Sequence, residues 1–288
     1  MKHAKIPDLN NTLLKISSIY TSLTKSEQKV ADVVMKEPEA AVFYTITDLS
    51  EKAGVGETSV IRFCRKLGFK GYQEFKLSVA QNLSTPSQNI HGDIQDEDEL
   101  SVVVQKISAM NRQNIENTTT LLDEESLRKA IAIIREAKKL FFFGVGSSGI
   151  TALDGKYRFM RLGYECSAEN DAHIIAMNAA LLKKGDVVVG VSTSGSTKDL
   201  VDALEIAKRR GARILCLTSH ARSPITQFAD VVLLTASKES PLQGGSFSSK
   251  MSQIHALDVL STAVALGQKE RTYEALEMTA KAVLDKLY

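Results

Sequence analysis

The first part of the chain, up to about residue 85, repeats apolar residues at the spacing of amphipathic helices. This pattern predicts helices over residues 10–22, 25–36, 47–53 and 57–67. Thr24 and Glu27 form the sequence of a capping box at the start of the second helix. The last two helices are short and are separated by Gly54-Val55-Gly56. Because two short helices joined by a glycine-containing turn are typical of a helix-turn-helix, we predict an all-α first domain.

Beyond about residue 120, helical patterns alternate with short, unbroken apolar runs. Such runs are typical of strands that are buried on both faces of a parallel sheet. Strands are predicted at 140–143, 164–167, from 187 onward, at 214–217 and at 231–234, with helices over 124–138, 148–162, 172–182, 198–210 and 249–266. This alternation predicts an α/β second domain with a doubly wound parallel sheet, and therefore ligands at the carboxyl ends of its strands.

A polar, acidic and aperiodic stretch lies between the two patterns, with the sequence STPSQNIHGDIQDEDEL over residues 84–100. This composition is typical of a linker. We predict a first domain over residues 1–82, a linker over 83–105 and a second domain over 106–288. A helix resumes near Glu99 and runs through Ile115, and the sequence leaves open whether it belongs to the linker or packs on the second domain.

Composition and charge narrow the classes of protein. The 288 residues carry a net charge of only +2, but residues 1–85 hold 12 Lys and Arg against 9 Asp and Glu, so the weak basic bias lies in the first domain. Cys64, Cys166 and Cys216 lie far apart, a spacing that predicts no metal site and no disulfide framework. No apolar run approaches the length of a membrane span. We predict a cytoplasmic protein that does not bind a membrane.

The loop after the apolar run at 187 contains five hydroxyl side chains and one glycine, in the order Ser192-Thr193-Ser194-Gly195-Ser196-Thr197. It precedes a predicted helix, whose first turn has unpaired N–H groups and the positive end of the helix dipole. Such a loop is suited to an anion, above all phosphate. The alternative is that the hydroxyls only cap the helix, but a cap needs one or two of them.

A second glycine-containing loop follows the strand at 140–143, with the sequence GVGSSG over residues 144–149. The spacing G-x-G-x-x-G is also that of dinucleotide-binding loops, and Glu165 lies at about the distance expected for a ribose contact. However, Ser147 and Ser148 and the other hydroxyl-rich loop favour a phosphorylated sugar, which two loops at adjacent strand ends can contact from opposite sides.

The predicted helix over 57–67 divides into two faces. Val60, Ile61, Phe63, Cys64 and Leu67 supply an apolar face, and the outer face is predicted to hold Thr58, Ser59, Arg62, Arg65 and Lys66, with Lys70 and Lys76 extending the basic surface. This pattern fits a DNA-binding helix, but it also fits a helix face that is merely solvated.

The segments SEQKVADVVMKEP and VGETSVIRFCRKLGFKGYQEFKLSVAQ resemble the N-terminal domain of the RpiR family of bacterial transcription regulators. The resemblance covers about residues 10–82 and implies that residues 57–67 form the recognition helix. It implies groove contacts for Thr58, Ser59, Arg62 and Arg65, and phosphate contacts for Lys66, Lys70 and Lys76.

Residues 124–268 resemble the SIS (sugar isomerase) domain, which is the usual C-terminal partner in that family, and VSTSGSTKDLV matches its most specific motif. The resemblance implies a flavodoxin-like sheet. It implies a phosphate site formed by Ser147, Ser148, Ser192, Thr193, Ser194 and Thr197. The segment from Ser246 to Lys250 matches the loop that borders the sugar, which makes Ser248 a contact, although Ser248 is equally suited to cap the last helix.

His173 lies near the position where some SIS isomerases hold a histidine that transfers protons. Many SIS isomerases also have glutamate where this chain has Ser196, and no other carboxylate is clearly placed to replace it. His173 is therefore interpreted as a hydrogen-bond partner of a sugar hydroxyl or as a surface residue, and we predict no catalytic residue.

Together these observations predict a two-domain transcription regulator, a repressor of genes of sugar metabolism, that binds a double-stranded DNA operator and is controlled by a phosphorylated sugar. We expect a homodimer or homotetramer, no cofactor and no metal. A sugar-phosphate ketose–aldose isomerase and an NAD-binding redox sensor are the alternatives.

Overall fold

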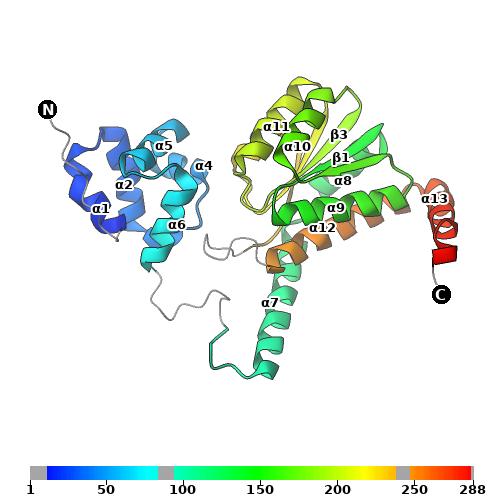
Figure 1. Ribbon diagram of the computed structural model, residues 1–288, viewed down its shortest axis with the longest axis horizontal. Helices are drawn as coiled ribbons and strands as arrows, with labels where there is room; N and C mark the ends of the chain where they lie inside the picture. The colour runs from blue at the N-terminus through cyan, green and yellow to red at the C-terminus, as the bar shows by residue number, and fades with distance from the viewer. Residues whose placement is uncertain (1–11, 84–93, 238–246, 287–288) are drawn as a thin grey trace. The chain divides into compact units, whose positions relative to one another are not determined.

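The computed structural model describes residues 12–83, 94–237 and 247–286. The chain forms two compact units (Figure 1). The boundary between them falls after Ile107. This boundary lies within a single helix, α7 (Leu100–Leu121), which starts in the second half of the predicted linker. Residues 84–93 of that linker lie outside the described residues. Each unit is described by itself below.

The first unit is all helical, as predicted. Its elements are α1 (Thr12–Ile19), η1 (Tyr20–Ser22), α2 (Lys25–Lys36), α3 (Pro38–Ala41), α4 (Ile46–Ala53), α5 (Glu57–Lys66) and α6 (Tyr72–Leu83). The capping box at the start of α2 is present, since Thr24 N–H donates to Glu27 Oε2 at 2.8 Å and Glu27 N–H donates to Thr24 Oγ1 at 3.4 Å. Gly54 ends α4 in the left-handed conformation and the turn over residues 54–56 leads into α5.

One apolar core holds these helices together. Val30 of α2, Leu49 of α4 and Phe63 of α5 are fully buried in it. The Phe63 and Phe75 rings meet edge to face with centroids 5.5 Å apart, a geometry that favours aromatic pairs beyond the area they bury. The helix-turn-helix is therefore a packed part of a bundle, and α5 has one face in the core and the other outside.

The second unit contains a five-stranded parallel sheet with strand order β2-β1-β3-β4-β5. Its strands are β1 (Lys139–Phe143), β2 (Cys166–Glu169), β3 (Asp186–Val191), β4 (Arg213–Thr218) and β5 (Val231–Leu234). This order is that of flavodoxin-like sheets, whose switch point lies between β1 and β3. The predicted fold class, an all-α domain followed by a doubly wound α/β domain, is confirmed.

Helices cover both faces of the sheet (Figure 1). One face packs against α8 (Glu124–Arg135), α9 (Ser147–Arg161) and α12 (Phe247–Leu266), and the other against α10 (Ala172–Leu181) and α11 (Lys198–Arg209). Successive strand residues point to opposite faces. Phe142 accordingly packs on Phe159 of α9, while Phe141 and Phe143 enter the core on the opposite face.

The structure differs from the predicted elements in several places, among them α3 and α6 of the first unit, which the sequence pattern did not predict. Strand β2 begins at Cys166, two residues later than predicted, because Tyr164 is buried against Phe159 and its hydroxyl donates to Gln268 Oε1 at 2.7 Å. Helix α13 (Lys269–Lys281) was not predicted, and none of its described residues is buried, so it has no strong apolar stripe to reveal it. The single turns η2 (Pro224–Gln227) and η4 (Leu284–Lys286) complete the unit.

No helix among the described residues combines the length and the apolar character that crossing a bilayer requires.

Candidate effector site and DNA-binding helix

The two hydroxyl-rich loops lie at the carboxyl ends of neighbouring strands. Strands β1 and β3 pair in parallel, with Phe143 opposite Gly190. The loop over residues 144–149 therefore leaves the sheet beside the loop over residues 192–197. Helices α9 and α11 begin in these loops, at Ser147 and Lys198. Two helix N-termini thus reach the same edge of the sheet, where their free N–H groups suit an anion.

The first loop is tightly packed against the start of α9. A Cβ atom on Gly144 would lie 2.6 Å from the carbonyl oxygen of Ser148, so this position admits only glycine. Ser147 and Ser148 form the first turn of α9, where Ser148 is buried and Ser147 is half-buried. Both predicted serines therefore lie at the helix N-terminus.

The second loop has a defined conformation that depends on its own hydroxyls. Ser192 Oγ accepts the N–H of Gly195 at 3.1 Å, and Ser194 Oγ accepts the N–H of Ser196 at 3.3 Å. Gly195 adopts a φ of +62°, and a Cβ atom there would lie 2.0 Å from Ser223 Oγ. The loop is therefore folded around a glycine that no other residue can replace without movement.

Thr197 occupies the N-cap position of α11, but within the described residues its side chain makes no capping hydrogen bond to that helix. Its hydroxyl lies 3.3 Å from Ser192 Oγ instead. The alternative that these hydroxyls simply cap a helix therefore does not account for Thr197. The N-terminus of α11 keeps N–H groups that an anion can accept, as the loop sequence predicts.

Gln253 joins the second loop to α9, the helix that follows the first loop, and the sequence analysis missed it. Its Nε2 donates to Thr193 Oγ1 at 3.0 Å, and its Oε1 accepts from Thr151 Oγ1 of α9 at 2.9 Å. Gln253 lies on α12, which is 60 and 102 residues away from these partners along the chain. No local motif marks such a residue, because only the folded sheet brings the three segments together.

The remaining predicted effector residues have different surroundings. His173 is exposed in the first turn of α10, where its N–H donates to the N-cap residue Asp171 at 2.9 Å. The side chain of Ser248 lies outside the described residues. Glu165, considered for a ribose contact, precedes β2 at the amino edge of the sheet and pairs with Lys139 at 3.0 Å. It is therefore at the wrong edge to meet a ligand at residues 144–149, which removes that argument for a dinucleotide.

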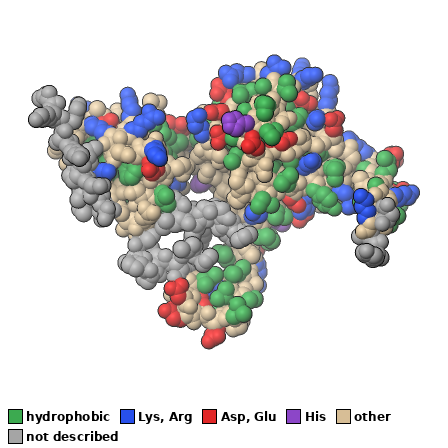
Figure 2. Space-filling model, in the orientation of Figure 1, with side chains coloured by type: hydrophobic (Ala, Val, Ile, Leu, Met, Phe, Trp, Pro, Cys, Tyr) green, Lys and Arg blue, Asp and Glu red, His purple; other side chains and the backbone are tan. Residues whose placement is uncertain are grey.

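The outer face of α5 is narrower than predicted. Thr58, Arg62 and Arg65 are exposed, and their spacing puts them on one stripe of the helix. Lys and Arg side chains gather on the first unit where α5 lies (Figure 2). Ser59 was wrongly placed on this face: it is only 8% exposed, because it lies one turn before the buried Phe63 and shares its side of the helix.

The three predicted phosphate-contacting lysines also differ from one another. Lys70 is exposed. Lys66 Nζ is instead bonded to Glu27 Oε2 at 3.1 Å and to the carbonyl oxygen of Ser22 at 2.6 Å, so it ties α5 to the start of α2. Lys76 Nζ donates to the carbonyl oxygen of Tyr44 at 2.8 Å, and burial lowers the pKa of Lys76 to about 8. Lys76 therefore bonds within the unit in this structure, and its contact to the DNA backbone stays a prediction.

Comparison with known proteins agrees with both halves of this description. Residues 10–86 match the model of the rpiR-family helix-turn-helix domain, and residues 133–263 match that of the SIS domain. An HTH-type transcriptional regulator of Haemophilus influenzae is 35% identical over 280 residues, covering 96% of this chain and 97% of the relative. The chain belongs to the rpiR family of transcriptional regulators. The resemblance found in the sequence is confirmed.

Two further proteins are similar along most of the chain. HexR of Pseudomonas aeruginosa is 32% identical over 258 residues, which cover 90% of each protein. The structure of Vibrio vulnificus NanR complexed with ManNAc-6P matches with a TM-score of 0.86 at 29% identity, covering 96% of this chain and 99% of NanR. The likeness therefore extends over both units and over the SIS domain that carries the two loops.

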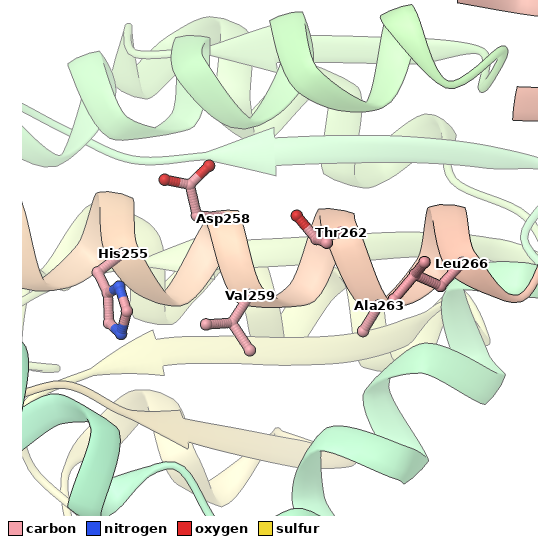
Figure 3. A pocket seen from close by; sticks show the side chains of 6 residues that line it. All are labelled: His255, Asp258, Val259, Thr262, Ala263 and Leu266. Atoms are coloured by element: carbon pink, nitrogen blue, oxygen red, sulfur yellow. The ribbon is translucent and has the colours of Figure 1, made fainter. Parts of the chain in front are cut away.

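A shallow groove in this rpiR-family chain lies elsewhere, on the outer face of α12. His255, Asp258, Val259, Thr262, Ala263 and Leu266 line it, and Figure 3 shows all six along this one helix. Its acidic group, Asp258, pairs with Arg158, and its other side chains offer few hydrogen-bond donors. A carboxylate and an apolar wall do not suit a phosphate, so the hydroxyl loops are the better candidate for an anion.

Proposed function

We propose that this protein is a DNA-binding transcriptional repressor of sugar-metabolism genes, controlled by a phosphorylated sugar bound between residues 144–149 and 192–197. The observation that carries the proposal is the meeting of two hydroxyl-rich loops and two helix N-termini at one edge of the sheet. Phosphate carries negative charge and accepts several hydrogen bonds. This edge supplies the matching groups, namely hydroxyl and N–H donors and the positive ends of two helix dipoles. The structure of NanR, which matches 96% of this chain with a TM-score of 0.86, is of a complex with the phosphorylated sugar ManNAc-6P.

We further propose that this site binds its ligand without converting it. Moving a proton between adjacent sugar carbons requires a base held beside the ligand, with a pKa near neutrality. His173 is exposed, and the loop has Ser196 where many isomerases of this fold hold glutamate. Because the same chain carries a helix-turn-helix, binding alone is enough for the site to control DNA binding.

For the other unit, we propose that Arg62 and Arg65 of α5 contact DNA in the major groove. Arginine is the side chain best suited to guanine edges and to phosphates. A single recognition helix reads few bases, and helix-turn-helix proteins gain affinity by binding two half-sites about 34 Å apart as dimers. We therefore propose a homodimer, or a homotetramer built from dimers, on a double-stranded operator.

The effector proposal is tested by a thermal-shift screen of phosphorylated sugars, beginning with ManNAc-6P, and of NAD and NADH. A ligand at 100 times its Kd stabilises the protein by about 2.7 kcal/mol. We expect a phosphorylated sugar to raise Tm, and Ser194→Ala to lose most of this rise. Ser261→Ala is the matched control, because Ser261 is a buried serine of α12 whose hydroxyl donates to the carbonyl oxygen of Asp258 at 3.2 Å.

The same screen separates the alternatives. Stabilisation by NAD(H) but by no phosphorylated sugar would favour the redox sensor and contradict the proposal. Conversion of a ketose phosphate to an aldose phosphate, abolished by His173→Ala, would establish the isomerase instead. A sugar phosphate that stabilises the protein and also changes its affinity for DNA selected from a random pool would support the regulator.

A further inference from the structure

Gln253 makes an unusual set of contacts for a polar residue in a protein core. It is 2% exposed, and Thr151, which donates to its Oε1, is fully buried. A buried amide without partners is destabilising, so its two hydrogen bonds fix its orientation. Both bonds lead to the elements that carry the hydroxyl loops. Thr151 lies one turn into α9, after Ser147 and Ser148, and Thr193 is part of the second loop.

Thr193 is held from its backbone as well as from its side chain. Its carbonyl oxygen accepts the N–H of Ser219 at 3.0 Å and the hydroxyl of Thr218 at 3.2 Å. Because Thr193 Oγ1 accepts from Gln253, the proton of its own hydroxyl stays available for another acceptor. Gln253 therefore determines which way this hydroxyl can donate.

The neighbours of Gln253 on α12 contact α7. Ser252 Oγ donates to the carbonyl oxygen of Asn114 at 3.5 Å, and His255 Nε2 lies 3.2 Å from Thr119 Oγ1. Helix α7 continues from these contacts to Leu100, beyond the boundary between the two units at Ile107. One end of α12 thus contacts the second loop, the first part of α9 that follows the first loop, and the helix through which the chain passes to the first unit.

We propose that Gln253 is a positioning residue that holds the two loops at a fixed separation and links them, through α12, to α7. For its part in effector binding, this inference rests on the proposed function. A ligand that contacts both loops then meets a site whose width is set by one side chain, and any change in loop separation acts on α12. The side chain itself need not touch the ligand.

The experiment compares Gln253→Met, Thr151→Val and the double variant in the full chain. Gln253→Met keeps the length of the side chain and removes both hydrogen bonds, while Thr151→Val removes only the hydroxyl. The matched control is Gln268→Met, which makes the same exchange and breaks a single bond to Tyr164 at the other edge of the sheet. Hydrogen exchange of loop amides is measured without ligand, and ManNAc-6P and the sugar phosphate that performs best in the screen are then titrated.

We expect Gln253→Met to raise exchange in residues 144–149 and 192–197 and to weaken effector binding by about 2- to 12-fold, the effect of a neutral hydrogen bond. The double variant should resemble Gln253→Met, because both changes break the same link. Exchange in both loops that matches the Gln268→Met control would overturn the inference. If Gln253→Met raises loop exchange but the wild type binds no sugar phosphate, the positioning role of Gln253 stands and the proposed function is contradicted.

Discussion

The substitution Gly195→Ala tests whether the conformation of the second loop is required for effector binding. At a φ of +62°, an L-residue pays about 1–2 kcal/mol relative to the right-handed conformation. The added Cβ would also lie 2.0 Å from Ser223 Oγ and 2.5 Å from Ser223 Cβ, distances that no rearrangement of a methyl group can relieve. Either the loop or the segment that carries Ser223 must therefore shift, and we expect the donors of the loop to be displaced.

The expected loss of affinity follows from those donors. Losing one hydrogen bond to a charged phosphate weakens binding by about 10- to 150-fold, so a displaced loop should lose at least tenfold. Gly211→Ala separates this effect from backbone strain. Gly211 has a φ of +82° and its added Cβ would meet nothing nearer than Lys184 Cβ, at 4.0 Å. Gly211→Ala therefore introduces the cost of the left-handed conformation at the end of α11 without a steric collision.

Urea denaturation and titration with the stabilising sugar phosphate are the two measurements. Both variants should lose about 1–2 kcal/mol of unfolding free energy from the left-handed conformation, and Gly195→Ala somewhat more. Only Gly195→Ala should lose effector affinity. If Gly195→Ala binds the sugar phosphate as tightly as Gly211→Ala does, the conformation of the loop is not what recognises the effector, and the reasoning from its geometry is refuted.

Two further predictions concern the first unit. Arg62→Ala combined with Arg65→Ala should weaken binding to selected DNA by about 1–3 kcal/mol per base-contacting arginine in a gel-shift titration, with effector affinity unchanged. Arg128→Ala is the control, and if both variants bind DNA with equal affinity, α5 is not the recognition helix. Burial acts to raise the pKa of Glu27, but bonds from Thr24 and Lys66 outweigh it, so its pKa lies below the ordinary 4.5. A carboxyl group with a lowered pKa stabilises the fold above its ordinary pKa, and this stabilisation is lost as the pH falls below it. Glu27→Gln should therefore be less stable than the wild type at pH 7, and its stability should fall less in acid below about pH 4.5. Unfolding free energies of the two proteins that run parallel across this pH range would contradict the prediction.

The sheet and its loops were predictable because they depend on local patterns. An apolar run such as the one at Val187 has few alternatives to a buried strand, and the serines that follow it are suited to few tasks other than binding an anion. Gln253 was not predictable, since its partners come together only after the sheet forms. Gln253 lies on α12, where the sequence alone does not distinguish it from the exposed polar residues of a long helix.

Faces of short helices were the weaker part of the prediction. Ser59 appeared polar and therefore external, but its position one turn before Phe63 puts it in the core. Lysines were judged by charge alone, although Lys66 and Lys76 each had a carboxylate or a carbonyl within reach in the folded unit. A long, flexible basic side chain can bond inward or outward, and composition does not distinguish the two.

The bond between Lys66 and Glu27 has a consequence for redesign. Lys66 belongs to α5, yet its ammonium holds the carboxylate that forms the capping box of α2. Replacing all of α5 with the corresponding helix of another regulator would thus exchange residues that stabilise the first unit together with the residues proposed to contact DNA. A graft limited to Thr58, Arg62 and Arg65 changes the exposed stripe and, inside the unit, only the bond from Arg62 Nη2 to Ser59 Oγ at 3.1 Å. Only these three exposed positions of α5 are suited to exchange, because the buried residues of the helix and Lys66 hold the first unit together.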